Sequence, residues 1–366
     1  MRARKLLTVL GTRPEIIRMS EIMRRLDTLC EQTIVFTGQN YQDELSGLFL
    51  RELGVRPLDV DLNIVEPMFA RQLGRILDGV DQQIERIRPD RMLVLGDTNS
   101  ALCAIAAARR GIPVYHLEAG NRCYDDRVPE EINRRIIDHC SAVLLPYTAR
   151  SKDNLVREGI ARDRIFVVGN PIFEVLERHT ERIAGSEALA RLGVAPQTFL
   201  LATVHRAENV DDPERIRGIF EGLDRASKRA GMRAIVSLHP RTAVRLKEFG
   251  VTLDEQRFTL SPPFGFFDFV ALERAARIVI TDSGTVQEEC CIFRVPNVTV
   301  RDTTERPETM EAGSNVLAGA SPDLIDSAIA LLLDSAPAWT PPAEYIVPNV
   351  SDIVARIVVG LSGRAR

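Results

Sequence analysis

Apolar residues along the chain alternate between short continuous runs and longer stretches in which they recur every three or four positions. Short runs rich in β-branched residues are typical of strands buried on both faces, and the longer spacing is typical of helices that cover such a sheet. The first half therefore predicts strands separated by helices. The predicted strands are 5–10, 33–37, 91–95, 114–116, 142–145 and 165–168, and the predicted helices include 14–27, 71–85 and 100–110.

The same alternation continues in the second half of the chain. The predicted strands there are 199–204, 234–238, 258–260, 277–281 and 298–300, with a helix over 213–229. Strands that alternate with helices from end to end predict an α/β fold, here two Rossmann-like doubly wound domains. Gly169-Asn170-Pro171 ends one strand and starts a new direction, so we expect domains at 1–170 and 171–349, with a last helix in 350–366 that packs back on the first domain.

Composition narrows the classes of protein that fit. A chain of 366 residues with 45% hydrophobic content agrees with about two domains at roughly 100–200 residues each. The net charge of −4 comes from 47 basic and 51 acidic residues spread along the chain, which argues against a nucleic-acid or membrane-surface partner. The apolar run 6–10 is too short for a secretory signal, and we expect a cytoplasmic protein.

The six cysteines lack Cys-x-x-Cys spacing, so we expect reduced thiols. The adjacent pair Cys290-Cys291 is the most conspicuous of them. Neighbouring residues on a helix point in different directions, and no second pair accompanies them. We therefore expect Cys290 and Cys291 to be core residues, and the sequence predicts no metal site.

In open α/β sheets ligands bind at the carboxyl ends of the strands, so the residues directly after each predicted strand are the first candidates. The first such loop reads Gly11-Thr12-Arg13-Pro14-Glu15, and Arg13 stands where a phosphate docks at a helix N-terminus. A structural salt bridge is the alternative role for Arg13. The loop matches neither Gly-x-Gly-x-x-Gly nor the P-loop, which argues against dinucleotide and ATP sites of those types.

Carboxylates follow the later strands of the first half. Asp97 lies in Gly96-Asp97-Thr98, Glu118 lies in His116-Leu-Glu118-Ala-Gly, and Glu130 opens Glu130-Glu131-Ile-Asn133-Arg134. Removal of a proton from carbon and its return to the opposite face require two groups, which a pair of carboxylates can supply. Asp97 equally fits a helix cap.

The second half adds cationic and small residues at strand ends. His205-Arg206 follows the first strand, and Asp282-Ser283-Gly284 leads into a helix that carries Glu288-Glu289. Backbone N–H groups and the Ser283 hydroxyl can hold a diphosphate there, while a carboxylate one turn later can accept ribose hydroxyls. The alternative is a capping box that only stabilises the helix. Arg306 beside Pro307 can complete an anion site, although most charge runs are merely solvated.

A set of motifs in one order resembles a known family. The motifs are Gly-Thr-Arg-Pro-Glu, Gly-Asp-Thr, His-x-Glu-Ala-Gly, Pro-Glu-Glu-x-Asn-Arg, a His-Arg strand end, Asp-Ser-Gly-x-x-Gln-Glu-Glu and Arg-Asp-Thr-Thr-Glu-Arg-Pro-Glu. Together they resemble the non-hydrolysing UDP-N-acetylglucosamine 2-epimerases from residue 6 to about residue 319. The resemblance implies two Rossmann-like domains of the GT-B arrangement, with the active site in the cleft between them, and an isomerase that commonly forms homodimers.

The resemblance also implies a reaction and a set of site residues. UDP is eliminated as the C2 proton leaves and the C1–O bond breaks, and it adds back to the resulting glycal without nicotinamide or metal, so no cofactor is expected. Asp97, Glu118 and Glu130 resemble the acid–base carboxylates, and His205 joins them as a cation for the departing diphosphate. The residues implied in UDP and sugar binding are Arg13, Arg18, Arg134, Phe269 (near uracil), Ser283, Gly284, Glu289 (on the ribose) and Arg306.

Some positions depart from the family's commonest pattern. Arg18 replaces the usual lysine, and Gln39-Asn40-Tyr41 stands where a Gln-His-Arg motif helps to form an activator site in some bacterial members. The segments 119–131 and 285–293 look closer to the branch that acts on 6-deoxy UDP-aminosugars for capsule or O-antigen. The implied substrate is therefore UDP-GlcNAc, converted to UDP-ManNAc, or a 6-deoxy relative of the UDP-N-acetyl-L-talosamine type. A GT-B glycosyltransferase, a hydrolysing epimerase and a non-enzymatic UDP-sugar binding protein are the alternatives.

Overall fold

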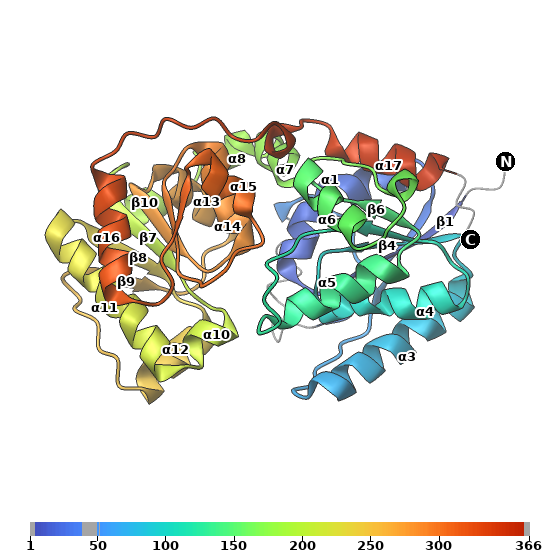
Figure 1. Ribbon diagram of the computed structural model, residues 1–366, viewed down its shortest axis with the longest axis horizontal. Helices are drawn as coiled ribbons and strands as arrows, with labels where there is room; N and C mark the ends of the chain where they lie inside the picture. The colour runs from blue at the N-terminus through green and yellow to red at the C-terminus, as the bar shows by residue number, and fades with distance from the viewer. Residues whose placement is uncertain (1–3, 39–49, 51, 362–366) are drawn as a thin grey trace. The chain divides into compact units, whose positions relative to one another are not determined.

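The computed structural model describes residues 4–38, 50 and 52–361 and divides the chain into two compact units (Figure 1). The N-terminal unit comprises Met1–Arg178 and Ala343–Arg366, and the C-terminal unit comprises His179–Pro342. Within the described residues each unit contains one six-stranded sheet in which neighbouring strands are parallel. Helices alternate with these strands along the chain, which confirms the predicted pair of Rossmann-like domains.

The sheet of the N-terminal unit has the strand order β3-β2-β1-β4-β5-β6. The chain moves outward from β1 through β2 to β3 and then returns to the other side of β1. The topological switch point therefore lies between β1 and β4, which is the position where ligands of open α/β sheets bind. The strands are β1 (Lys5–Leu10), β2 (Glu31–Phe36), β3 (Val60–Asp61), β4 (Arg91–Leu95), β5 (Val114–Leu117) and β6 (Val143–Leu145).

Helices cover both faces of this sheet. On one face α3, α4 and α5 contact one another in sequence order, and on the other α1 contacts α7 and α17; Figure 1 shows α5 and α17 on opposite sides of β4. The helices are α1 (Arg13–Asp27), α3 (Phe69–Ile87), α4 (Ala104–Arg109), α5 (Pro129–Cys140), α6 (Ala149–Arg157), α7 (Ile172–Arg178) and α17 (Val350–Gly360), with 3-10 turns at Asn99–Cys103, Arg162–Arg164 and Ala343–Ile346.

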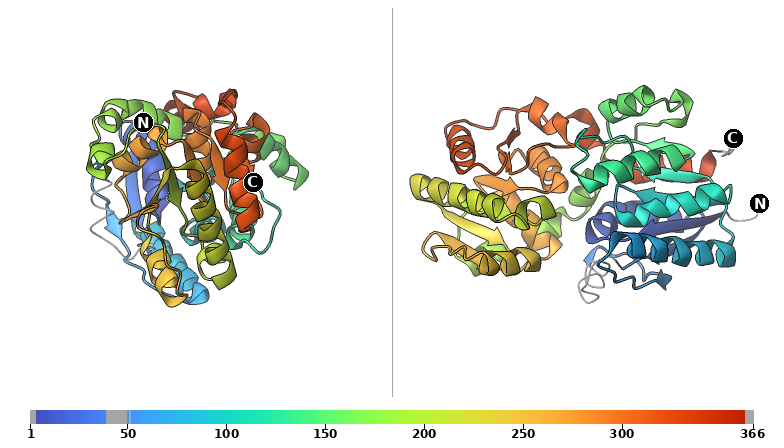
Figure 2. Two further views of the ribbon diagram at one scale, coloured as in Figure 1. Left: turned by 90° about the vertical axis from the view of Figure 1, so that its left-hand side faces the viewer. Right: turned by 60° about the horizontal axis from the view of Figure 1, so that its bottom comes forward.

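The sheet of the C-terminal unit repeats the same order as β12-β11-β10-β7-β8-β9, so its switch point lies between β7 and β10. One helical layer contains α11 and α16, which contact along their lengths, and another contains α13 with α8, α9 and α14. Figure 2 gives two further views of the same ribbon. The strands are β7 (Phe199–Thr203), β8 (Arg233–Ser237), β9 (Phe258–Ser261), β10 (Ile278–Thr281), β11 (Asn297–Thr299) and β12 (Asn315–Leu317).

The helices of this unit begin with residues that suit their first turns. α11 has an Asp212 cap that accepts hydrogen bonds from two backbone N–H groups and a proline at its start, and α16 is capped by Ser321. No described helix is long and apolar enough to span a membrane. The helices are α8 (Thr180–Ala184), α9 (Ala188–Leu192), α10 (Ala207–Val210), α11 (Pro213–Ala230), α12 (Pro240–Glu248), α13 (Phe266–Ala275), α14 (Gly284–Phe293), α15 (Pro307–Ala312) and α16 (Pro322–Leu333).

The last helix and α7 both belong to the N-terminal unit. α17 packs against α1, and Arg25 Nε lies 2.6 Å from the Asp352 carboxylate. α7 also contacts α1, so the chain changes unit after Arg178, beyond the boundary that we expected near Asn170. The interval between Asn170 and Arg178 thus packs with the sheet that precedes it.

Two details of the predicted elements were wrong. The segment 165–168 forms an isolated bridge between Ile165 and Leu144, and Phe166 N donates to Leu144 O at 2.9 Å, but it does not continue as a strand. The predicted helix 100–110 begins instead as a 3-10 turn and becomes α-helical at Ala104. β3 and β12 were not predicted, because strands of two or three residues carry too little alternation to be recognised.

Candidate active site

The loops after β1 and β4 meet through the carboxyl group of Glu15. Its Oε2 accepts hydrogen bonds from Gly11 N at 2.9 Å and Thr12 Oγ1 at 2.7 Å, and its Oε1 accepts from Thr98 Oγ1 at 3.1 Å. Gly11 is required there, because a Cβ at this position would lie 1.8 Å from Ser100 Oγ. Glu15 therefore joins the two sides of the switch point, although the sequence analysis did not select it.

Glu15 is fully buried, and burial raises its pKa from 4.5 to about 7 despite these hydrogen bonds. A raised carboxyl pKa stabilises the fold below pH 4.5, and this contribution is lost as pH rises towards 7, because only the unfolded chain readily ionises. We expect Glu15→Gln to remove this pH dependence. Between pH 4.5 and 7 the free energy of unfolding of the parent should fall by roughly 3 kcal/mol relative to the variant in urea titrations. Parallel curves for the two proteins would contradict the assignment.

Asp97, directly after β4, is held by α5. Arg134 Nε lies 2.8 Å from Asp97 Oδ2, and Asn133 Nδ2 donates to the backbone oxygen of Asp97 at 2.9 Å. The Arg134 guanidinium also binds Glu131 at 2.8 Å and is almost fully buried, whereas the Asp97 side chain keeps 21% of its exposure. The carboxylate is thus fixed in orientation and still reachable from solvent.

Glu118, directly after β5, lies in the same region. A Cβ on Gly96 would lie 3.9 Å from Glu118 Oε2, which places this carboxylate beside the loop that carries Asp97. Glu118 forms an ion pair with Arg18, and it accepts hydrogen bonds from Tyr147 Oη at 3.1 Å and Asn121 Nδ2 at 3.2 Å.

The backbone at Glu118 is unusual as well. Its φ of +69° lies in the left-handed region, which is uncommon for a residue with a long side chain and is concentrated at functional sites. The side chain is only 5% exposed. Burial, strain and a cationic partner therefore coincide at one carboxylate, which makes Glu118 the strongest candidate for proton transfer in the N-terminal unit.

A buried polar network supports this loop from within the unit. His116 Nδ1 lies 2.7 Å from Asp138 Oδ1, and His116 Nε2 lies 2.8 Å from the carbonyl oxygen of Gly96. Asp138 also accepts from Arg122 at 2.7 Å and from Gly120 N at 3.2 Å. Burial raises the pKa of Asp138, but the charges of His116 and Arg122 outweigh it and hold that pKa below its usual value. The network ties the loops after β4 and β5 to α5.

The other two predicted site residues of this unit are Arg13 and Glu130. Arg13 is the first residue of α1, and burial lowers its pKa. Glu130 lies half-buried in the first turn of α5, whereas the adjacent Glu131 is fully buried and accepts from the backbone N–H groups of Cys123 at 3.0 Å and Tyr124 at 3.1 Å. Glu131 is therefore structural, and Glu130 stays a predicted site residue.

In the C-terminal unit Asp282 organises the switch point between β7 and β10. Its fully buried carboxylate accepts from the backbone N–H groups of His205 at 3.0 Å and Arg206 at 2.9 Å, and from Asn209 Nδ2 at 3.1 Å. His205 Nδ1 lies 3.3 Å from the same carboxylate, and 40% of the His205 side chain is exposed. Asp282 belongs to a predicted motif, but its contact with His205 could not be predicted from that motif.

The start of α14 has the properties of an anion site. Ser283 is the N-cap residue, and its side chain makes no capping hydrogen bond, which excludes the capping box as its role. A Cβ on Gly284 would lie 2.9 Å from Glu305 Oε1 and 3.6 Å from the Arg306 Cζ atom, so the ion-paired Glu305 and the Arg306 guanidinium both stand next to the first turn of the helix. Backbone N–H groups at a helix N-terminus beside an arginine favour a phosphate group.

Arg306 is itself held in a buried cluster of charges. It is 4% exposed, forms an ion pair with Glu288, and lies 3.9 Å from Glu305. Arg301 in turn lies 2.8 Å from Glu305. The carboxylates fix the guanidinium of Arg306 in place before any ligand binds.

Two further candidates lie on neighbouring helices of the same unit. Phe269 is half-buried on α13, where it packs against the core between α13 and α14, and Glu289 is 4% exposed on α14. All six cysteines are free, and Cys290 and Cys291 are fully buried, which confirms the prediction that this pair belongs to the core. In the part of the chain that the structure describes, no group of three or more His, Cys, Asp and Glu side chains is arranged to hold a metal ion.

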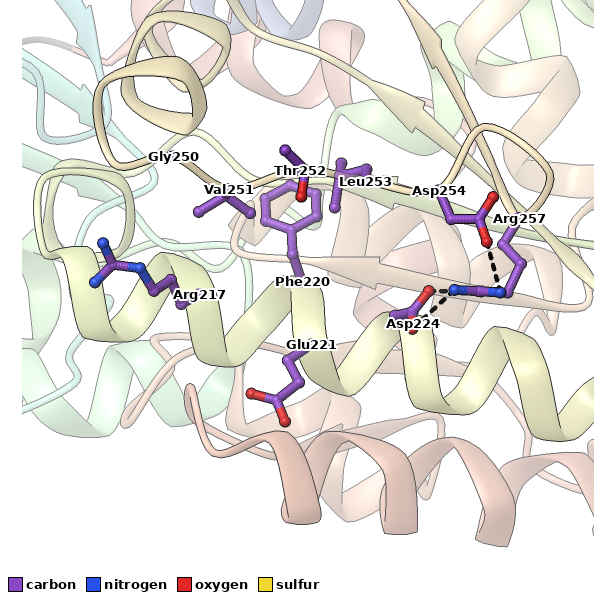
Figure 3. Close-up of a pocket in the computed structure, with 10 residues that line it drawn as sticks. All are labelled: Arg217, Phe220, Glu221, Asp224, Gly250, Val251, Thr252, Leu253, Asp254 and Arg257. Atoms are coloured by element: carbon purple, nitrogen blue, oxygen red, sulfur yellow. Dashed lines mark hydrogen bonds and ion pairs between the residues drawn. The ribbon is translucent and has the colours of Figure 1, made fainter.

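A cavity of about 520 Å³ in the C-terminal unit lies away from these residues (Figure 3). It opens between α11 and the segment that precedes β9, so it is not at the carboxyl ends of β7 and β10. Its Arg257 lies 2.7 Å from both Asp224 and Asp254. Because no candidate residue lines the cavity, it has no role in the site described above.

Comparison with known proteins finds relatives that match nearly the whole chain. Residues 24–358 match the family model described as UDP-N-acetylglucosamine 2-epimerase. The UDP-N-acetylglucosamine 2-epimerase of Methanocaldococcus jannaschii is 39% identical over 346 residues, which cover 92% of this chain and 94% of that protein. The UDP-2,3-diacetamido-2,3-dideoxy-D-glucuronate 2-epimerase of Pseudomonas aeruginosa is 37% identical over 326 residues, 88% of this chain and 90% of that protein.

The same likeness holds for solved structures. The crystal structure of the M. jannaschii enzyme in complex with UDP-GlcNAc and UDP superposes with a TM-score of 0.91 at 38% identity, over 96% of this chain and 99% of that one.

Gln39-Asn40-Tyr41, where the sequence departs from an activator motif, lies outside the described residues.

Proposed function

The chain belongs to the UDP-N-acetylglucosamine 2-epimerase family, and from this membership we infer that it is an isomerase that inverts C2 of a UDP-sugar. The observation that carries the inference is the likeness, over nearly the whole chain, to an epimerase whose structure holds UDP-GlcNAc and UDP. The two switch points support it, because each carries the residue types that one half of such a substrate requires. Cations and a helix N-terminus lie in the C-terminal unit, and carboxylates lie in the N-terminal unit.

We assign the nucleotide half of the substrate to the C-terminal unit. The Ser283 hydroxyl, the backbone N–H of Gly284 and the guanidinium of Arg306 bind the diphosphate, to which His205 adds a further donor. Glu289 accepts the ribose hydroxyls, and Phe269 stacks against uracil. The arrangement that supports this assignment is the approach of Arg306 to the first turn of α14.

We assign the chemistry at C2 to Asp97, Glu118 and Glu130 of the N-terminal unit. One carboxylate takes the C2 proton, the electron pair forms the C1–C2 double bond, and the C1–O bond breaks with its electrons on UDP. A second carboxyl group returns a proton to the other face of C2 as UDP adds back to C1. Arg18 and Arg134 orient Glu118 and Asp97 through the ion pairs described above, and Arg13 stabilises the charge that develops on the diphosphate.

The substrate that we propose is a UDP-N-acetylhexosamine, either UDP-GlcNAc, which becomes UDP-ManNAc, or a 6-deoxy relative. Relatives within the family differ in the substituents that their sugars carry, as the P. aeruginosa diacetamido-glucuronate enzyme shows by name. C2 and its acetamido group are common to these substrates. The proposed carboxylates therefore act on the shared part of the molecule.

Incubation with UDP-GlcNAc in D2O tests this function. We expect the C2 epimer with one deuterium at C2, visible by NMR and as a one-dalton mass increase, and free UDP only in traces, because the intermediate is captured again. Stoichiometric free UDP with free sugar would indicate a hydrolysing enzyme. Binding of UDP without deuterium exchange, for every UDP-HexNAc and 6-deoxy UDP-HexNAc tried, would contradict the proposal.

We further propose that the protein acts in the cytoplasm as a homodimer and supplies a sugar nucleotide for polysaccharide synthesis. The free thiols agree with a reducing compartment. Sedimentation equilibrium of the purified protein tests the dimer, since a mass near the 40.8 kDa of one chain at micromolar concentration would contradict it.

A further inference from the structure

The buried carboxyl group of Glu273 lies next to Glu289, the residue to which we assign the ribose hydroxyls. Glu273 is on α13, is fully buried, and is hydrogen-bonded to the side chain of Glu289 on α14. Its Oε1 also accepts a hydrogen bond from Cys290 Sγ at 3.2 Å. Glu273 was not among the predicted site residues, and the proposed function gives it no role.

Two carboxyl groups can share a hydrogen bond only when one of them carries a proton. No donor group of the described residues faces Glu273 Oε2, which is buried, so an ionised Glu273 would place an uncompensated charge in the core. Burial, followed by the charge of Glu289, raises the pKa of Glu273 well above its usual range. These observations place the shared proton on Glu273.

We propose that Glu273 is a positioning residue that donates a hydrogen bond to Glu289 and holds that carboxylate ready to accept the ribose hydroxyls of the nucleotide. This inference rests on the proposed binding of UDP by the C-terminal unit. A carboxylate that accepts from Glu273 on one side keeps its remaining lone pairs directed at the ligand. A rigid acceptor of this kind discriminates strongly against an analogue that lacks a hydroxyl, because the carboxylate would then stay buried and unsatisfied.

Glu273 also lies close along α13 to the residue that we assign to uracil. Phe269, assigned to uracil, precedes Glu273 by four residues and therefore lies on the same side of α13, one turn away. The Glu273–Glu289 hydrogen bond thus joins the helix that carries the base ligand to the helix that carries the ribose ligand. Base and ribose recognition are coupled through one proton.

The test compares the dissociation constants of UDP and 2′-deoxy-UDP by calorimetry with the full-length protein. We expect the parent to prefer UDP, and Glu273→Leu to lower this preference about tenfold, the value of one hydrogen bond to a charged group. Glu273→Gln, whose amide still donates to Glu289, should keep the preference closer to the parent. Cys290→Ala, which removes the other partner of Glu273, should leave it unchanged.

Three possible results separate the role of Glu289 in ribose binding from the role of Glu273. A parent that binds UDP and 2′-deoxy-UDP equally would contradict the ribose role of Glu289, and hence the proposed function. A preference that Glu289→Gln abolishes but Glu273→Leu leaves intact would overturn only the role of Glu273. A proportional loss of both affinities in Glu273→Leu would indicate a structural role and likewise overturn the proposal.

Infrared spectroscopy provides a measurement that does not depend on the folding of the leucine variant. The parent at pH 7 should show the C=O stretch of a buried protonated carboxyl group that is absent from Glu273→Gln. A difference spectrum without this band would show that Glu273 is ionised, and the proposed hydrogen bond to Glu289 would then be impossible.

Discussion

Replacement of Glu118 by glutamine is expected to lower the turnover number by about 10²–10⁴-fold and to leave the affinity for UDP almost unchanged. The amide is nearly isosteric but cannot accept a proton from C2. It can still present its oxygen to Arg18 and Tyr147, so the loop after β5 should keep its structure. UDP affinity should persist because the residues assigned to uracil and ribose, and most of those assigned to the diphosphate, lie in the other unit.

Steady-state kinetics and UDP calorimetry on the same preparation check this expectation. Glu21→Gln is the matched control, since Glu21 is also a buried carboxylate of the N-terminal unit with arginine partners, but it lies in the middle of α1. Its turnover should match that of the parent. Normal turnover in Glu118→Gln would remove this residue from the proton transfer, and an equal loss in the control would attribute the effect to damaged packing.

Much of this architecture could be predicted from local sequence. β1 and β4 have the predicted bounds, because their apolar residues are buried on both faces and the runs end at glycine turns. The positions of the candidates after strands also follow from sequence, since a parallel α/β sheet collects the carboxyl ends of its strands at one edge. Asp97, Glu118 and His205 could therefore be selected before any contact was known.

The partners of these residues could not be predicted in the same way. Arg18 and Glu118 are 100 positions apart, and Asp282 and His205 are 77 apart, so their contacts depend on strand order and not on local pattern. Strand order is decided by packing between distant segments. The one local signal for this support was His116, which lies on β5 two positions before Glu118.

The buried carboxyl groups were the largest omission. Glu15 belongs to the predicted loop Gly11-Thr12-Arg13-Pro14-Glu15, but no role was predicted for it there. Glu273 occurs in a stretch whose neighbours do not distinguish it from a surface glutamate. Their roles follow from burial and from the groups that face them, three donors for Glu15 and a second carboxyl group for Glu273. Such information exists only in the folded chain.

Replacement of Arg306 by alanine is expected to weaken UDP binding by about 100-fold and to leave the much weaker binding of uridine unchanged. The guanidinium is almost completely buried beside the first turn of α14, where a charge-assisted contact with phosphate contributes roughly 1.5–3 kcal/mol. Uridine has no phosphate, so its affinity should not depend on this arginine. The comparison of the two ligands therefore separates loss of a phosphate contact from collapse of the nucleoside site.

Replacement of Arg306 also removes the ion-pair partner of Glu288. Alanine would leave Glu288 as a fully buried carboxylate without its ion pair, which commonly costs about 3–5 kcal/mol of stability. Arg306→Ala should therefore be measured together with the double variant Arg306→Ala/Glu288→Gln, in which the amide removes that charge. Arg257→Ala serves as the control, because Arg257 also pairs with two carboxylates of this unit but lies at the cavity of Figure 3. Equal losses for UDP and uridine in the double variant would show that Arg306 supports the fold and not the diphosphate.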